Sequence, residues 1–179
     1  MLNPEKSCLV LIDVQEKLAA VMDESARMVA NCAILLQAAR TLEVPVLWCQ
    51  QAPQSLGPTV EPLRAHLEGI SPINKRSFSC CGQPEFAAAL ERGRFETAIL
   101  CGIESHVCVF QTAMDVMQRG LYVHVIADAV TSRTPENKQI GLTRMAAAGA
   151  VVSSTEMLLF ELLRTAEHEH FRTLSRLVK

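Results

Sequence analysis

The sequence predicts a three-layer α/β domain, in which helices cover both faces of a parallel sheet of six strands. Apolar runs of strand length recur along the chain, and segments of helical periodicity separate them. The first run, residues 8–12, is apolar at every position, which is typical of a strand buried on both faces. Because no repeat, low-complexity tract or linker interrupts residues 1–179, we expect a single domain.

The six predicted strands alternate with helices along the chain. In chain order, the strands are expected at residues 8–12, 44–49, 70–75, 97–101, 121–127 and 150–152. The helices are expected at residues 26–42, 62–67, 84–92, 105–119, 134–148, 157–164 and 167–177. Proline and glycine in residues 50–61 predict a loop of a size suited to an active-site wall or a subunit contact.

Local signals define where several of these helices begin and end. Pro45 prevents the first helix from continuing, and Gly120 is a helix stop. Thr134, followed by proline and glutamate, is a good helix start. The stretch from Ser153 to Glu156 fits a capping box.

The composition excludes several classes of function. The net charge is −2 and neither sign forms a long block, so nothing favours binding to nucleic acid or to an anionic membrane. Aromatic residues make up 4% of the chain, too few for base-stacking platforms. No apolar run approaches the roughly 20 residues of a membrane helix. The first residues lack a signal-peptide pattern, so a cytoplasmic protein is expected.

Seven cysteines in a chain of this kind are expected to be unpaired thiols. Cys8, Cys49 and Cys101 lie within apolar runs, where a free thiol behaves as a small hydrophobic side chain. There is no CxxC pair to indicate zinc or a dithiol redox centre. The adjacent pair Cys80-Cys81 leaves open a redox protein, which requires a bond between these two residues.

Polar side chains follow the predicted strands at the edge where open parallel sheets bind ligands. Asp13 follows the first strand, Gln50 the second, Lys75 ends the third and Asp128 follows the fifth. Two of them, Asp13 and Lys75, have a structural alternative. Asp13 and Glu16 resemble a capping box that starts a helix, and a single lysine such as Lys75 is commonly a solvated surface residue.

Cys108 is the candidate nucleophile after the fourth strand. Ser105 is a plausible N-cap, which places Cys108 in the first helical turn, where the helix dipole favours thiolate over thiol. His106 cannot easily act as its base, because residues two apart on a helix point to different sides. The alternative is a buried helix cysteine, since Val107, Val109 and Phe110 are apolar.

Three motifs together resemble the isochorismatase-like cysteine hydrolases. They are Leu11-Ile12-Asp13-Val14-Gln15, Lys75-Arg76-Ser77-Phe78-Ser79 and Cys101-Gly102-Ile103-Glu104-Ser105-His106-Val107-Cys108-Val109. Residues 127–133 and 56–60 add further matches, and the branch of isochorismatase domain-containing proteins is the most similar. The resemblance implies the Rossmann-like isochorismatase fold, a six-stranded parallel sheet with helices on both faces.

The resemblance also implies a catalytic triad of Asp13, Lys75 and Cys108. Asp13 would take the thiol proton, Lys75 would stabilise the charges, and Cys108 would attack a carbonyl carbon to give a thioester. Backbone N–H groups of Glu104 and Cys108 would form the oxyanion hole, and the Ile103–Glu104 peptide bond is expected to be cis. The family also implies a homo-oligomer, a dimer or larger.

Two departures from the family pattern narrow the expected activity. Nicotinamidases bind a metal through an Asp-x-His arrangement after the second strand, whereas this chain has Cys49-Gln50-Gln51-Ala52, so no metal or other cofactor is expected. True isochorismatases lack the nucleophilic cysteine. The expected activity is therefore metal-independent hydrolysis of a small amide, carbamoyl or ester substrate.

The candidate pocket wall consists of Gln15, Gln50, Phe78 and His106. A scaffold or interaction protein that keeps the fold without turnover is the alternative from another functional class.

Overall fold

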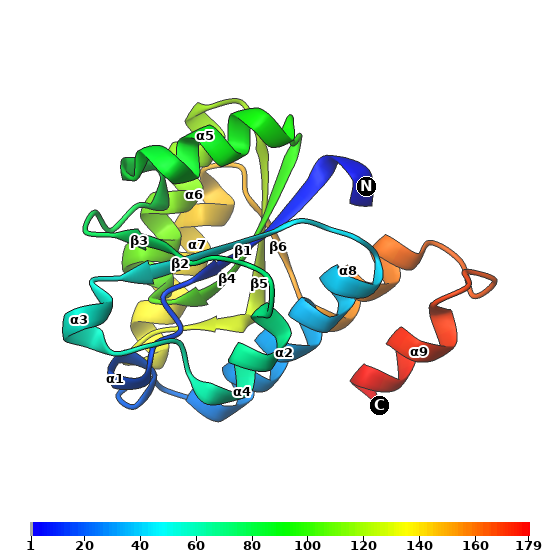
Figure 1. Cartoon of the computed structure of the whole chain (residues 1–179), viewed down its shortest axis with the longest axis horizontal. Helices are drawn as coiled ribbons and strands as arrows, with labels where there is room; N and C mark the ends of the chain where they lie inside the picture. The colour runs from blue at the N-terminus through cyan, green and yellow to red at the C-terminus, as the bar shows by residue number, and fades with distance from the viewer. Residues whose placement is uncertain (1) are drawn as a thin grey trace.

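The computed structural model describes residues 2–179 and contains a six-stranded parallel sheet in the order β3-β2-β1-β4-β5-β6 (Figure 1). The strands are β1 Ser7–Ile12, β2 Val46–Gln51, β3 Ile73–Lys75, β4 Thr97–Ile103, β5 Tyr122–Thr131 and β6 Val151–Ser153. The predicted α/β class and the parallel sheet are confirmed.

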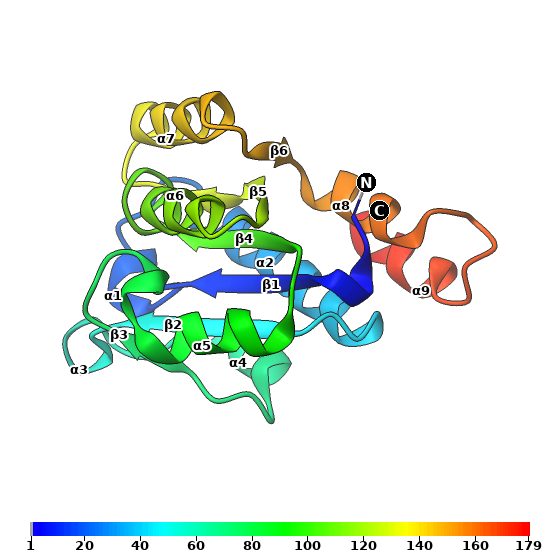
Figure 2. The same ribbon diagram turned by 90° about the horizontal axis from the view of Figure 1, so that it is seen from above.

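Helices cover both faces of the sheet, as Figures 1 and 2 show. One face carries α2 Ser25–Thr41, α4 Glu61–Arg64, α8 Thr155–Leu163 and α9 Phe171–Ser175. The other carries α5 Pro84–Gly93, α6 Phe110–Gln118 and α7 Pro135–Ala147. Two short helices, α1 Glu16–Ala19 and α3 Pro53–Leu56, lie in the connections after β1 and β2. None of the helices in residues 2–179 is both long and apolar enough to cross a membrane.

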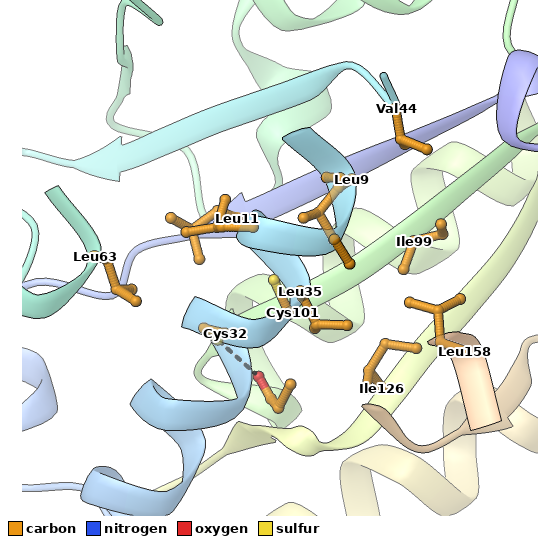
Figure 3. Close-up of a cluster of buried hydrophobic side chains, with 14 of the residues drawn as sticks. Leu9, Leu11, Cys32, Leu35, Val44, Leu63, Ile99, Cys101, Ile126 and Leu158 are labelled. Atoms are coloured by element: carbon orange, nitrogen blue, oxygen red, sulfur yellow. Dashed lines mark hydrogen bonds between the residues drawn. The ribbon is translucent and has the colours of Figure 1, made fainter. Parts of the chain in front are cut away.

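The central strands are buried on both sides because their side chains supply two hydrophobic cores. Leu9 and Leu11 of β1 pack beneath α2, in the core that Figure 3 shows. Cys8, Val10 and Ile12 alternate with them and pack toward α5 and α6. All six residues of β1 and all seven of β4 are buried. This explains why the sequence of these strands is a continuous apolar run.

Thr134 begins α7 as predicted, whereas the cap of α8 lies one residue after Ser153, the first residue of the predicted capping box. The Thr134 side chain accepts a hydrogen bond from the Asn137 N–H at 3.2 Å at the start of α7. At α8 the capping side chain is Ser154, which accepts from the Met157 N–H at 3.2 Å. Each such cap contributes about 1 kcal/mol of helix stability.

Several element boundaries differ from the predicted ones. The third strand contains only Ile73–Lys75, and residues 50–61, predicted as loop, begin with the end of β2 and contain α3. The fifth strand continues past residue 127 to Thr131, because a register shift against β4 lets it bulge and resume pairing. Asp128 therefore lies inside β5, where its Oδ1 accepts hydrogen bonds from the Thr155 N–H and hydroxyl, away from the predicted ligand edge.

The direction in which strands are added to the sheet reverses between β1 and β4. From β1 the chain proceeds outward to β2 and β3, and then returns to the other side of β1 to form β4, β5 and β6. The connections after β1 and β4 therefore leave the sheet in opposite directions, and ligands of open α/β sheets bind at such a switch point. Asp13 follows β1, and Cys108 lies just beyond β4.

Gly102 allows β1 and β4 to approach closely at this point. Its φ is +114°, and a Cβ atom there would lie 2.0 Å from the Ile12 carbonyl oxygen. We expect Gly102→Ala to lower the free energy of unfolding by about 3 kcal/mol or more, from unfavourable φ plus overpacking. Urea denaturation measures this change.

Gly120→Ala is the matched control. Gly120 also has positive φ, +86°, but no atom lies within 4 Å of the Cβ position. Gly120→Ala should lower the free energy of unfolding only by the cost of the unfavourable φ, about 1–2 kcal/mol. Equal losses at the two positions would contradict the close approach of β1 to β4.

Candidate active site

Asp13 occupies a sharp turn at the carboxyl end of β1. Its φ is +52°, a left-handed conformation that aspartate tolerates better than most residues. Its N–H donates to the Cys49 carbonyl at 3.1 Å, and its own carbonyl accepts from the Gln15 N–H at 2.7 Å. Gln15, not Asp13, is the residue before α1, and no side chain caps that helix. The capping alternative for Asp13 therefore does not hold.

Lys75 forms an ion pair with Asp13 inside the protein. Its Nζ lies 2.6 Å from Asp13 Oδ2, and both side chains are fully buried. The ammonium also donates to Gln51 Oε1 at 2.8 Å, to the Phe78 carbonyl at 2.9 Å and to the Ser77 carbonyl at 3.2 Å. Burying two charges costs several kcal/mol per ion unless such partners compensate. The surface alternative for Lys75 is therefore wrong.

Burial and the ion pair act on the pKa values of this pair in opposite directions. Burial raises the pKa of the Asp13 carboxyl, while the charge of Lys75 and hydrogen bonds from Lys75 and Cys108 oppose the rise. Burial alone would lower the pKa of Lys75, but the negative charge of Asp13 reverses this and raises it. Lys75 is thus held protonated, and Asp13 is a stronger base than an ordinary carboxylate.

Cys108 lies in one turn of π-helix, Ser105–Val109, that joins β4 to α6. The predicted N-cap at Ser105 is wrong: the Ser105 hydroxyl donates to the Thr131 carbonyl at 2.9 Å and caps nothing. The predicted shift toward thiolate is also contradicted. Burial, followed by the charge of Asp13, raises the pKa of the Cys108 thiol, and Lys75 opposes this only in part. Cys108 is 7% exposed, and its raised pKa favours the neutral thiol.

The Asp13 carboxylate has one oxygen to spare. Oδ2 is taken by Lys75, whereas Oδ1 is buried and has no hydrogen-bond partner among residues 2–179. The Cys108 thiol lies near this carboxyl group, and each group acts on the pKa of the other. A buried acceptor without a partner is rare and requires an explanation. This free acceptor beside a thiol is what a general base needs.

The four predicted pocket residues lie in different surroundings. Gln15 is fully buried and uses its amide on the backbone of Gln51 and Gly57. Gln50 donates to the Thr59 hydroxyl at 2.9 Å.

The other two, Phe78 and His106, are more exposed to solvent. The Phe78 side chain is 55% exposed, beside the carbonyl that Lys75 holds. The His106 ring lies 3.0 Å from the Ser132 hydroxyl.

Gln51 is a site residue that sequence reasoning missed. Its Oε1 accepts from Lys75 at 2.8 Å, and its Nε2 donates to the Arg76 carbonyl at 2.8 Å. Gln50 and Gln51 are adjacent and chemically identical, but their side chains point to opposite faces of the sheet. Which of them meets Lys75 therefore depends on the strand register, and in the β2–β3 ladder Gln51 is the residue that pairs with Lys75. A predicted register for β3 was the one signal that could have identified it.

The backbone around Cys108 is held by Glu104. The Ile103–Glu104 peptide bond is cis. The Glu104 carbonyl accepts from the Val107 and Val109 N–H groups, both at 3.1 Å. The Glu104 carboxylate lies 3.3 Å from the Arg133 guanidinium.

All seven cysteines are unpaired, including Cys80 and Cys81. Residues 2–179 contain no group of three or more His, Cys, Asp or Glu side chains placed to hold a metal ion.

Comparison with known proteins identifies the family. The sequence profile described as Isochorismatase domain matches residues 7–157. The chain belongs to the isochorismatase family. Isochorismatase domain-containing protein 2A of Mus musculus is 38% identical to it over 177 residues, a match that covers 98% of this chain and 84% of that protein.

Two solved structures share the fold of this chain. A Caenorhabditis elegans protein named MAR1 ribonuclease superposes with a TM-score of 0.94 at 35% identity, covering 99% of this chain and 91% of its own. The YcaC protein of Escherichia coli, described as an octameric hydrolase of unknown specificity, gives a TM-score of 0.92 at 22% identity, covering 98% of this chain and 88% of that chain. The chain thus has the isochorismatase fold.

Opposite charges beside Cys108 predict opposite pKa changes when each is removed. Because Asp13 raises the pKa of the thiol and Lys75 lowers it, Asp13→Asn should lower that pKa and Lys75→Met should raise it. Ultraviolet thiolate absorbance against pH measures this, after subtraction of the matching Cys108→Ser protein. Circular dichroism confirms that each variant is folded. Shifts of the same sign in both variants would contradict the arrangement.

Proposed function

We propose that this protein is a metal-independent cysteine hydrolase that cleaves a small amide, carbamoyl or ester substrate through a thioester on Cys108. One observation carries the proposal: a thiol lies beside a buried carboxylate whose other oxygen is fixed by a buried ammonium. A pair so costly to bury is explained when it activates the adjacent nucleophile. Membership of the isochorismatase family supports hydrolysis, and the residues around Cys108 support a thiol nucleophile.

Nucleophile activation begins from the neutral thiol. In the proposed first step, the Cys108 sulfur attacks the substrate carbonyl carbon while its proton moves to Asp13 Oδ1. Coupling the two events avoids a free thiolate, which burial disfavours. Lys75 stays protonated throughout. Its positive charge keeps Asp13 ionised before the attack. Asp13 loses its negative charge only when it takes the proton from Cys108 during the attack.

Acylation and deacylation use the same carboxyl group. In the proposed sequence, Asp13 returns its proton to the leaving nitrogen or oxygen as the carbon–heteroatom bond breaks, which leaves the thioester and ionised Asp13. Asp13 then takes a proton from water, and the resulting hydroxide adds to the thioester carbon. Collapse of that adduct expels Cys108, which regains the proton, and releases the carboxylic acid. The net reaction consumes one water per bond cleaved.

The remaining components of the proposed site come from the chain around Cys108. The backbone N–H groups of Glu104 and Cys108 form the oxyanion hole, and loss of one such donor typically costs about 10²–10³ in rate. Phe78 and His106 form the pocket wall, because their side chains are half-exposed or exposed. Gln15 and Gln50 support the site from inside, since their amides bond to the protein itself.

The oligomeric state is part of the proposal. The octameric description of YcaC and the exposed apolar side chains of this chain, such as Tyr122 at 73% and Met157 at 62% exposure, support self-association. Light scattering coupled to size-exclusion chromatography tests it, and a monomer across the micromolar range would contradict it.

Hydrolysis should depend on Cys108 and not on the more exposed thiol of Cys81. With a panel of small neutral amides, carbamoyl compounds and esters, Cys108→Ala should lose about 10³-fold or more in kcat/KM. Cys81→Ala is the matched control and should match the wild type. Intact-mass analysis should find an acyl adduct on the wild-type protein that Cys108→Ala lacks.

An unstructured RNA oligonucleotide is tested as an alternative substrate in the same experiment, because the MAR1 relative is named a ribonuclease. We expect no cleavage, since the buried ammonium of Lys75 is already surrounded by protein acceptors. Turnover by Cys108→Ala, or RNA cleavage with every amide and ester left intact, would overturn the proposal. A wild-type protein inactive on the whole panel would favour the scaffold alternative.

A further inference from the structure

The ammonium of Lys75 has no hydrogen left for a substrate. A protonated lysine has three N–H donors. Four acceptors lie within 3.2 Å of its Nζ: one carboxylate oxygen, one amide oxygen and two backbone carbonyls. Every donor is therefore engaged by the protein, and the charge can act on the reaction only through the groups that it already touches.

Gln51 is the side chain that links these acceptors together. Its Oε1 accepts from Lys75, and its Nε2 donates to the Arg76 carbonyl, each at 2.8 Å. Arg76 precedes the two residues, Ser77 and Phe78, whose carbonyls also accept from Lys75. One amide therefore fixes both the ammonium and the backbone segment that curls around it.

Gln51 is itself held by Gln15. The Gln15 Oε1 accepts from the Gln51 N–H at 2.7 Å, and its Nε2 donates to the Gln51 carbonyl at 3.0 Å. Gln15 is fully buried and lies two residues after Asp13. The contacts close a ring: from Asp13 along the chain to Gln15, across to Gln51, on to Lys75 and back to Asp13.

We propose that Gln51 is a positioning residue that directs Lys75 onto Asp13 and keeps the ammonium away from the substrate, an inference that rests on the proposed hydrolase function. The ring joins the carboxyl ends of β1, β2 and β3, three strands whose relative placement would otherwise decide the Asp13–Lys75 distance. Small displacements at such a site are costly in rate.

Kinetics of Gln51→Met test the inference. This variant keeps the length of the side chain and removes both hydrogen bonds. It should lower kcat about 10- to 100-fold with KM changed less than about 3-fold, because only the reacting groups are displaced. Gln51→Glu keeps an acceptor oxygen at the same distance from the backbone. At the pH optimum of this variant, the loss in kcat on a logarithmic scale should be at most about half of the loss in Gln51→Met. Gln111→Met, on the exposed side of α6, is the matched control and should behave as wild type.

The pH profile of Cys108 alkylation by iodoacetamide provides a readout that does not need a substrate. Loosening Lys75 weakens the one cation near the thiol that favours ionisation, so Gln51→Met should move the profile to higher pH. A purely structural role would reduce the folded fraction and leave the profile of the folded protein unchanged. Thermal melts measure that fraction.

The outcomes separate this inference from the proposed function. If Gln51→Met matches wild type in both kcat and alkylation profile, Gln51 does not position Lys75, whether or not the protein is a hydrolase. If the wild type hydrolyses nothing in the panel but the profile shifts as expected, the positioning role stands and the proposed hydrolase function fails.

Discussion

The buried ion pair between Asp13 and Lys75 is the interaction on which the site depends. Two charges lie 2.6 Å apart with no exposure to solvent, an arrangement that an apolar pair of similar volume could replace without loss of stability. The surrounding acceptors compensate the ammonium, but they leave one carboxylate oxygen unpartnered. The structure thus maintains a buried base at some cost in stability, beside a thiol.

Sheet topology explains how residues distant in sequence form this pair. Asp13 and Lys75 end strands that have β2 between them, and the side chain of Lys75 reaches across the end of that strand. Cys108 arrives from the opposite direction, after β4, because the chain reverses its direction of travel at β1. Gly102 lets β4 approach β1 closely, and the turn that follows β4 brings Cys108 near Asp13.

Electrostatics at Cys108 favour a mechanism in which proton transfer and attack coincide. A thiol whose pKa is raised by burial and by a carboxylate is a poor source of free thiolate. The same carboxylate is a good proton acceptor, because burial raises its own pKa as well. Because the pKa values of the Cys108 thiol and the Asp13 carboxyl group are both raised, the proton can pass directly from one to the other without solvent.

The sequence by itself determined the fold class, the parallel sheet and the strand ends at which Asp13, Lys75 and Cys108 lie, because apolar runs, caps and breakers are local signals. It also identified the family through three motifs. Only the tertiary structure decided the features that depend on where each side chain points and how deeply it is buried. It placed Gln51 rather than Gln50 against Lys75, turned Ser105 away from its predicted cap, and reversed the expected pKa shift of Cys108. A helix dipole is visible in sequence, but the desolvation and neighbouring carboxylate that outweigh it exist only once β1 and β4 have paired.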